Sequence, residues 1–421
     1  MTNGTQPRRL SAILCADWGK EAQKRAVYVA DVSARVVRRV SADRWSVAGV
    51  FAEAERWTST GSVLAAFDAP LGVPESYLTA LGRLPHAAPM ETFLDLLTRA
   101  RSMPRFYDAT TVARDWIVER PFFSVPAGGG GLGGYVDAAA RLGVEMYRQI
   151  DRMTGAKAVF IKSGIPGSVG SAACALWQEL ASQLTRDRTF KIWPFEGELQ
   201  DLLQSTSVVV GEMYPRAAYA TALLEAPPTS RAPMFVAKTD AGVRREAIAT
   251  LRAARWVRSL SVELEDLAQA EANEDDFDAC VTAASLLRCV LEGAPLCRPR
   301  LESAASEGGM LGTGSVNLQL PQRTFPRQAR ERPLAQPTVR TARKPVEPGR
   351  SDASLVRADV GDAVRVFRCP IAGCDKVFLG SRGGWDGHVG SLRLHPNWHP
   401  ELEEAAARKR RFETEFPMFF R

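Results

Sequence analysis

The sequence predicts an α/β protein whose core is a mixed sheet with flanking helices. Three runs of β-branched and apolar residues near the N-terminus have the lengths and boundaries of paired strands: Leu10–Ala16, Ala26–Val32 and Arg35–Val40. Two later runs, Val63–Ala69 and Val208–Met213, are apolar enough to be buried strands of the same sheet. Segments with helical spacing, such as Arg244–Ser259, separate or follow these strands, which indicates helices packed against the sheet.

Composition is that of an ordinary globular chain. The 421 residues are 45% hydrophobic and 24% charged, and they suffice for two or three domains of about 150 residues each. We find no apolar run of about 18 residues and no secretory signal pattern, so we expect a cytoplasmic protein without a membrane span. Seven irregularly spaced cysteines argue against a disulfide framework. The net charge of +6 is compatible with nucleic acid binding, although many basic proteins bind none.

Changes in composition divide the chain into four parts. We place these at residues 1–297, 298–362, 363–400 and 401–421. The first is the α/β domain, with a helical insertion at about 73–189. The second is rich in Pro, Gly, Ser and Arg, so it is expected to be a flexible basic linker. The third is a small module, and the fourth is a helix or tail containing Arg408-Lys-Arg-Arg.

Acidic residues lie at the ends of the predicted strands and at the start of the last predicted helix of the domain. They are Asp17, Asp68, Glu212 and Asp278, with Asp275 as a further candidate. Phosphodiester hydrolysis can use two Mg²⁺ ions, which take several carboxylate ligands from separate elements. These acids therefore predict a catalytic centre for divalent metal, either Mg²⁺ or Mn²⁺. Alternatively, each acid is a solvated turn residue, and Asp275 or Asp276 is the helix N-cap.

Four basic residues are candidates for contacts with substrate phosphates: Lys20, Lys162, Lys238 and Arg244. The glycine-containing turn 164–170 follows Lys162 and opens a predicted helix, where free N–H groups could hold an anion. The alternative for each residue is a solvated surface cation, and for the glycines a structural turn.

At these residues the chain resembles a known family. The matching motifs are Asp17-Trp-Gly-Lys, Phe67-Asp-Ala-Pro-Leu-Gly, Gly211-Glu-Met-Tyr-Pro and Asp275-Asp-Phe-Asp-Ala-Cys-Val-Thr-Ala-Ala, together with Lys238 and Arg244. They resemble the predicted nucleases catalogued as domain of unknown function 429, over roughly residues 10–295. The resemblance implies an RNase H-like fold with the first acid on the opening strand and the last on a C-terminal helix. It also implies phosphodiester cleavage that depends on Mg²⁺ or Mn²⁺.

The small C-terminal module carries a pattern of zinc ligands. Cys369 and Cys374 are followed by His388 and His395, and aromatic residues flank the cysteines. Zn²⁺ takes four such ligands, and it stabilises hairpin–helix units that are too small to fold alone. The module resembles a two-Cys, two-His zinc finger, although thirteen residues separate Cys374 from His388 and six separate the two histidines. His399 is therefore an alternative fourth ligand.

Together these features predict a metal-dependent nuclease that uses two metal ions, with a zinc finger that aids binding. DNA and RNA both remain open as the nucleic acid partner, and a protein partner of the finger or linker is possible. Two other interpretations also stay open. One is an ATPase of the actin-like or sugar-kinase-like fold, and the other is a non-catalytic nucleic-acid-binding or adaptor protein.

Overall fold

The computed structural model describes two parts of the chain. The first is residues 8–326, without 86–89, 127–130, 166 and 186–187. The second is residues 366–416, without 372–373, 375–376, 380–394, 396–397, 400 and 402–403. The chain divides into two compact units, Met1–Glu331 and Arg332–Arg421, and each is described here by itself. None of the helices in the described parts combines the length and the apolar character that crossing a membrane requires.

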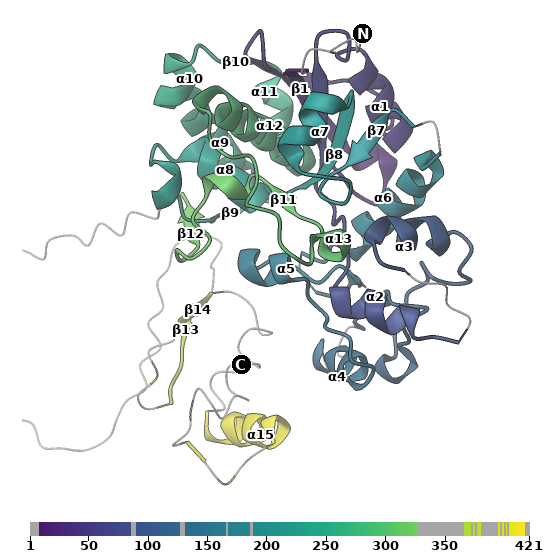
Figure 1. Ribbon diagram of the computed structural model, residues 1–421. Coiled ribbons are helices and arrows are strands. Elements are labelled where there is room, and N and C mark those ends of the chain that lie inside the picture. Colours follow the sequence, from purple (N-terminus) through teal and green to yellow (C-terminus); the bar gives the residue numbers. More distant parts are fainter. Residues whose placement is uncertain are drawn as a thin grey trace, which may run out of the picture. The chain divides into compact units, whose positions relative to one another are not determined.

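A central mixed sheet forms the core of the first unit, as expected (Figure 1). Its strands in spatial order are β10 (Glu263–Leu264), β3 (Val36–Val40), β2 (Ala26–Asp31), β1 (Leu10–Asp17), β4 (Ser62–Phe67), β8 (Val208–Met213) and β11 (Met310–Leu311), and β7 (Phe190–Ile192) also pairs with β8. The neighbours β1, β2 and β3 are antiparallel, whereas the other pairs are parallel. The parallel arrangement brings the carboxyl ends of β1, β4 and β8 to one end of the sheet.

Side chains that alternate along the strands build two apolar layers, one on each face of the sheet. Leu14 and Ala65 lie in the layer that includes α1 (Val47–Glu55) and α6 (Gly170–Gln183). Ile13 and Leu64 lie in the layer that includes five helices: α7 (Leu199–Ser205), α8 (Pro215–Leu223), α9 (Ala241–Ala253), α11 (Leu267–Ala272) and α12 (Glu274–Glu292). We call these the α1 face and the α12 face. The short α10 (Arg255–Ser259) follows α9 and joins the α12 face.

The region expected to be a helical insertion is mainly helical. Its helices are α2 (Glu75–Gly82), α3 (Phe93–Ala100), α4 (Gly133–Arg141), α5 (Gln149–Thr154) and α6. It also contains a small parallel sheet of β5 (Phe123–Ser124) and β6 (Ile161–Ser163). In Figure 1, α2, α3 and α4 gather at the end of the unit away from α9 and α10. Single 3₁₀ turns complete the unit at Ala22–Lys24, Ala113–Asp115, Pro228–Ser230 and Thr313–Ser315.

The expected linker, 298–362, begins too early, because the residues up to 326 belong to the first unit. They form α13 (Ala304–Glu307), β11 on the central sheet, and β12 (Arg323–Phe325), which pairs with β9 (Met234–Val236). These elements are too short to show a periodic pattern in the sequence. Gly308 marks their close packing, because a Cβ there would lie 2.0 Å from the Leu71 carbonyl oxygen. Residues 327–362 lie outside the described residues.

The second unit contains a hairpin and a helix. Strands β13 (Val366–Arg368) and β14 (Val377–Leu379) are antiparallel, and Phe367 pairs with Phe378. Helix α15 (Ala405–Glu415) contributes Phe412 to a small apolar cluster with Cys369 and Ile371.

Candidate functional site

Three carboxylates from separate elements meet at the carboxyl end of the central strands. Asp17 is the last residue of β1, and Asp68 follows directly after β4. Asp278 comes from α12, which packs over β1 and β2. One carboxylate oxygen from each residue lies within 4.8 Å of the others. The Asp68 amide, which donates to the Ala16 carbonyl at 2.9 Å, continues the pairing of β1 with β4 and so fixes the two strand ends together. We call these three residues the acidic triad.

Burial and like charge make Asp17 and Asp68 of the acidic triad costly to ionise. Burial raises the pKa of Asp17, and the negative charge of Asp278 raises it further. The same two causes raise the pKa of Asp68 from 3.8 to about 7. Lys238 lowers the pKa of both carboxyls, but its single positive charge does not offset burial and repulsion. A bound divalent cation would supply the charge that is missing.

Two side chains hold the Asp278 carboxylate. The ammonium of Lys238 forms an ion pair with Oδ2, and the hydroxyl of Tyr219 donates to Oδ1. Burial lowers the pKa of Lys238, but the charges of Asp278, Asp17 and Asp68 outweigh burial and raise it overall. Lys238 is therefore a permanent cation beside the acidic triad. Tyr219 was not predicted, because a tyrosine inside an apolar helix gives no sequence signal of this contact.

Arg244 stabilises the position of Lys238 through hydrogen bonds to the backbone. Its side chain is buried, and its three nitrogens donate to the carbonyls of Lys238, Glu271 and Ala272 at 2.5, 3.1 and 2.7 Å. These bonds join α9 to the segment that leads into α12. Arg244 was expected to contact substrate phosphate, but the structure uses its guanidinium to position Lys238 and the start of α12.

Glu212 points away from the acidic triad. It pairs in register with Phe67, the neighbour of Asp68, so its side chain leaves the sheet on the α1 face. There its Oε2 and Oε1 accept hydrogen bonds from Nη1 and Nη2 of Arg148 at 2.7 and 2.8 Å. The backbone N–H of Leu71 donates a further bond to Oε2 at 2.8 Å. The structure therefore does not place Glu212 among the three acids that converge, although its charge still raises the pKa of Asp68.

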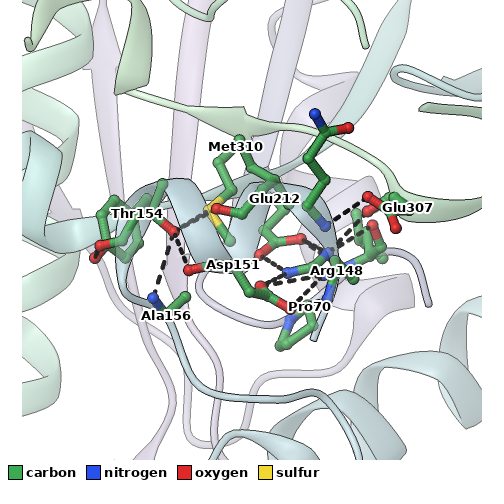
Figure 2. A network of polar contacts seen from close by, with 12 residues as sticks. Pro70, Arg148, Asp151, Thr154, Ala156, Glu212, Glu307 and Met310 are labelled. Carbon is green, nitrogen blue, oxygen red and sulfur yellow. Dashed lines mark hydrogen bonds and ion pairs between the residues drawn. The ribbon is translucent and has the colours of Figure 1, made fainter. Parts of the chain in front are cut away.

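Arg148 is the centre of a buried network that joins the insertion to the sheet (Figure 2). It is fully buried, and its Nη2 also donates to Asp151 at 2.8 Å. Its Nη1 donates to the carbonyls of Leu71 and Glu307, each at 3.2 Å. A buried guanidinium needs this many acceptors, since unpaired donors in the interior are destabilising.

The first turn of α12 carries the other predicted acids. Asn273 is the N-cap, and its Oδ1 accepts from the amides of Asp275 and Asp276, so neither aspartate has that function. Asp276 forms an ion pair with Arg39 at 2.5 Å. Asp275 is half-buried near the acidic triad, and burial raises the pKa of its carboxyl to about 6. It is not one of the residues whose oxygens converge.

The two remaining predicted cations lie in different surroundings. Lys20 is exposed in the connection from β1 to β2, which begins directly after Asp17. It makes no hydrogen bond or ion pair with the residues that the structure describes. Lys162 lies on β6 in the insertion, where it donates to the Tyr107 carbonyl at 2.5 Å and sits over the Phe122 ring. Lys162 is thus bound to the insertion rather than to the central sheet.

A second cluster of metal-ligand type lies in the C-terminal unit. Cys369, Cys374 and His395 each place one ligand atom within 4.8 Å of the others. Burial in this apolar cluster raises the pKa of the Cys369 thiol to about 12. His388, the other predicted ligand, lies outside the described residues.

The geometry distinguishes His395 from His399. The ring of His399 contacts Glu401 through Nδ1 at 2.7 Å and Glu415 through Nε2 at 2.6 Å, so both of its nitrogens are engaged. Arg408 of the basic C-terminal segment is buried and donates to the carbonyls of His395 and His399, each at 2.8 Å. Arg408 therefore positions the histidine segment, a role that no pattern in the sequence indicates.

Comparison with known proteins identifies a family but no individual relative. No curated protein matches the chain, and no solved structure matches it. The model of the family described as "Protein of unknown function (DUF429)" matches residues 16–302, which is more than half of the chain. The matched range includes the acidic triad, Lys238 and the Arg148–Glu212 pair, and it ends before the Cys/His cluster. The chain therefore belongs to the family described as protein of unknown function, DUF429.

Proposed function

We propose that the protein is a metal-dependent nuclease with an RNase H-like core, and that it hydrolyses phosphodiester bonds at the acidic triad. The observation that carries this proposal is the convergence of Asp17, Asp68 and Asp278 within 4.8 Å from three separate elements. Folding alone does not favour bringing three carboxylates together, two of them buried and Asp68 partly buried, because their mutual repulsion destabilises the folded state. A divalent cation that the carboxylates hold would remove this cost.

The donor set fits Mg²⁺ or Mn²⁺. All three residues offer carboxylate oxygen, the ligand that these hard cations prefer, and open positions would remain for water and substrate phosphate. Such ions supply a Lewis acid that activates water and stabilises the leaving oxygen in phosphodiester hydrolysis. Tyr219 fixes the orientation of Asp278. The Lys238 ammonium, held in place by Arg244, can offset negative charge that develops on the phosphate.

The Cys/His cluster is proposed to hold Zn²⁺ as a structural ion, with Cys369, Cys374 and His395 among its ligands. Zinc would brace the C-terminal unit, whose apolar cluster is too small to stabilise it alone. A unit tethered to the nuclease domain can raise the local concentration of nucleic acid at the acidic triad. The proposed partner of the zinc unit is nucleic acid, either DNA or RNA, or another protein.

One observation favours a second candidate, a non-catalytic nucleic-acid-binding or adaptor protein. Both oxygens of Asp278 already have partners, Lys238 and Tyr219, as a purely structural carboxylate would. In that case the acidic triad would bind no divalent ion, and the C-terminal unit would carry the function.

The test is cleavage of labelled single-stranded and double-stranded DNA and RNA with Mg²⁺ or Mn²⁺. Wild type is compared with Asp17→Asn and Asp278→Asn, and Asp201→Asn is the control, since Asp201 is exposed on α7. The proposal expects cleavage by wild type and the control, and none by the two triad variants. Equal cleavage by all four would overturn it. Absence of cleavage by wild type, with binding that depends on Cys369, would favour the adaptor.

A further inference from the structure

Lys238 reaches the acidic triad from a connection outside the central sheet. It follows β9 and precedes α9, and both of these elements pack against α8. The Lys238 amide donates to the Val236 carbonyl at 2.8 Å, and the Lys238 carbonyl accepts from Arg244 at 2.5 Å. Asp240, two residues later, is the N-cap of α9. The backbone of Lys238 is therefore fixed on both sides, and the ammonium is directed at the acidic triad.

The three carboxylates of the acidic triad differ in their partners. Asp278 has a partner for each oxygen, since Lys238 pairs with Oδ2 and Tyr219 donates to Oδ1. The carboxylates of Asp17 and Asp68 make no hydrogen bond or ion pair with the residues that the structure describes. Their negative charges act on the Lys238 ammonium from a longer distance. Two carboxylates of the triad are thus open to a cation, whereas the third already has one.

A centre for two divalent ions, which the sequence predicts, needs room for both ions beside the same carboxylates. The ions of such a centre lie roughly 3.5–4 Å apart, and between them they stabilise the attacking and the leaving oxygen of the phosphodiester. Here the Lys238 ammonium is in contact with Asp278, one of the three carboxylates that converge. Because two cations at such a distance repel strongly in a partly buried site, the ammonium disfavours a second ion.

The charges of the site also match a single divalent ion. The three carboxylates carry three negative charges when they are ionised, and Lys238 offsets one of them. One Mg²⁺ or Mn²⁺ offsets the remaining two. Asp275 lies at the side of the triad, where it is half-buried, and its oxygens do not converge with the other three. Solvent and salt can therefore screen the charge of Asp275 without a second bound ion.

We propose that the acidic triad binds one divalent ion and that the Lys238 ammonium takes the place of a second. Asp17 and Asp68 hold the ion through their open carboxylates, and Asp278 remains paired with Lys238. This proposal rests on the proposed function and deepens it. Lys238 supplies, at the phosphate of the substrate, the positive charge that the second ion supplies in a two-ion centre.

The test counts the Mn²⁺ ions bound by the full-length chain loaded with zinc, from the electron paramagnetic resonance signal of free Mn²⁺ during a titration. Lys238→Met is compared with Lys20→Met, which removes the same charge from an exposed lysine in the connection after Asp17. The proposal expects about one ion per chain for wild type and Lys20→Met, and about two for Lys238→Met. Lys238→Arg keeps the charge and should bind one. Asp17→Asn should bind none at the same concentrations.

The spectrum of the bound Mn²⁺ provides an independent readout that needs no substitution of Lys238. Two Mn²⁺ ions roughly 3.5–4 Å apart give a spin-coupled spectrum, whereas a single ion gives an uncoupled one. The spectrum is recorded with Mn²⁺ alone and with single-stranded and duplex phosphorothioate DNA, because a second ion can arrive with the substrate. The proposal expects an uncoupled spectrum from wild type in each case, and a coupled spectrum from Lys238→Met.

The outcomes separate this proposal from the proposed function. A coupled pair in wild type that Asp17→Asn loses would overturn the single ion and leave a nuclease with two ions. One uncoupled ion in Lys238→Met, with folding verified by circular dichroism, would also overturn it, because Lys238 would then not exclude the second ion. One uncoupled ion in wild type and a coupled pair in Lys238→Met, without cleavage by wild type, would support the single-ion site and overturn the nuclease. Absence of Mn²⁺ binding in wild type would overturn both.

Discussion

The guanidinium of Arg148 donates hydrogen bonds to both carboxylate oxygens of Glu212, with nitrogen–oxygen distances of 2.7 and 2.8 Å. Both side chains are buried, and the pair joins the residue before α5 to the central strand β8. A paired, two-point contact of this kind is strongly directional. It fastens the insertion to the sheet, so Glu212 has a structural role at the position where the sequence suggested a metal ligand.

This role predicts a large loss of stability when Arg148 is removed. Arg148→Met leaves Glu212 and Asp151 buried without their cation, and it should lower the free energy of unfolding by about 3–5 kcal/mol. The matched control is Arg152→Met on α5, the helix that follows Arg148, because its ion pair with Glu145 is exposed and should contribute about 1 kcal/mol or less. Urea unfolding measures both variants, and equal losses would contradict the structural role.

Metal binding to the acidic triad predicts that Mg²⁺ or Mn²⁺ stabilises the protein. At a concentration one hundred times the dissociation constant, the gain should be about 2.7 kcal/mol and visible as a higher Tm. Asp17→Asn should lose this gain, whereas Asp201→Asn should keep it. Thermal unfolding in the presence of chelator and of each metal provides the measurement. If Mg²⁺ or Mn²⁺ still raises the Tm of Asp17→Asn, the metal binds at a site other than the acidic triad.

The raised pKa of Asp68 predicts a pH dependence of stability in chelator. The unfolded chain releases this proton near its ordinary pKa of 3.8, whereas the folded protein keeps it up to about 7. The free energy of unfolding should therefore fall as pH rises between these values, and then level off. Asp68→Asn removes the charge and should reduce the fall. Urea midpoints measured from about pH 5 to about pH 8 test this, and unchanged pH profiles in the variant would refute it.

The Cys/His cluster predicts bound zinc that depends on Cys369 and His395 but not on His399. Cys369→Ser and His395→Asn should lose zinc, as measured by elemental analysis of the purified chain. His399→Gln should retain zinc, since its ring is held by Glu401 and Glu415. The control Cys297→Ser changes a cysteine of the first unit and should retain zinc as well. Retention of zinc by Cys369→Ser would exclude this site.

The sequence by itself determined the main strands of the sheet and which predicted elements carry acidic residues. Apolar runs with defined ends predicted β1, β2, β3, β4 and β8, because strand formation and burial leave a pattern in neighbouring residues. The acids at the ends of these runs led to Asp17 and Asp68, and the acidic start of the last predicted helix led to Asp278. The C-terminal cysteines Cys369 and Cys374 were identified as zinc ligands from their spacing in the sequence.

Only the tertiary structure decided which side chains face one another. Register places Glu212 opposite Phe67 and so on the α1 face, and alternation alone does not reveal register. Its partner Arg148 lies 64 positions earlier in the chain, and Tyr219 lies 59 positions before Asp278. Such contacts depend on how distant elements pack, and no local pattern of residues records them. The same packing buries Arg244, which the sequence suggested as a phosphate contact, and Arg408 of the basic C-terminal segment, and both guanidinium groups donate to backbone carbonyls.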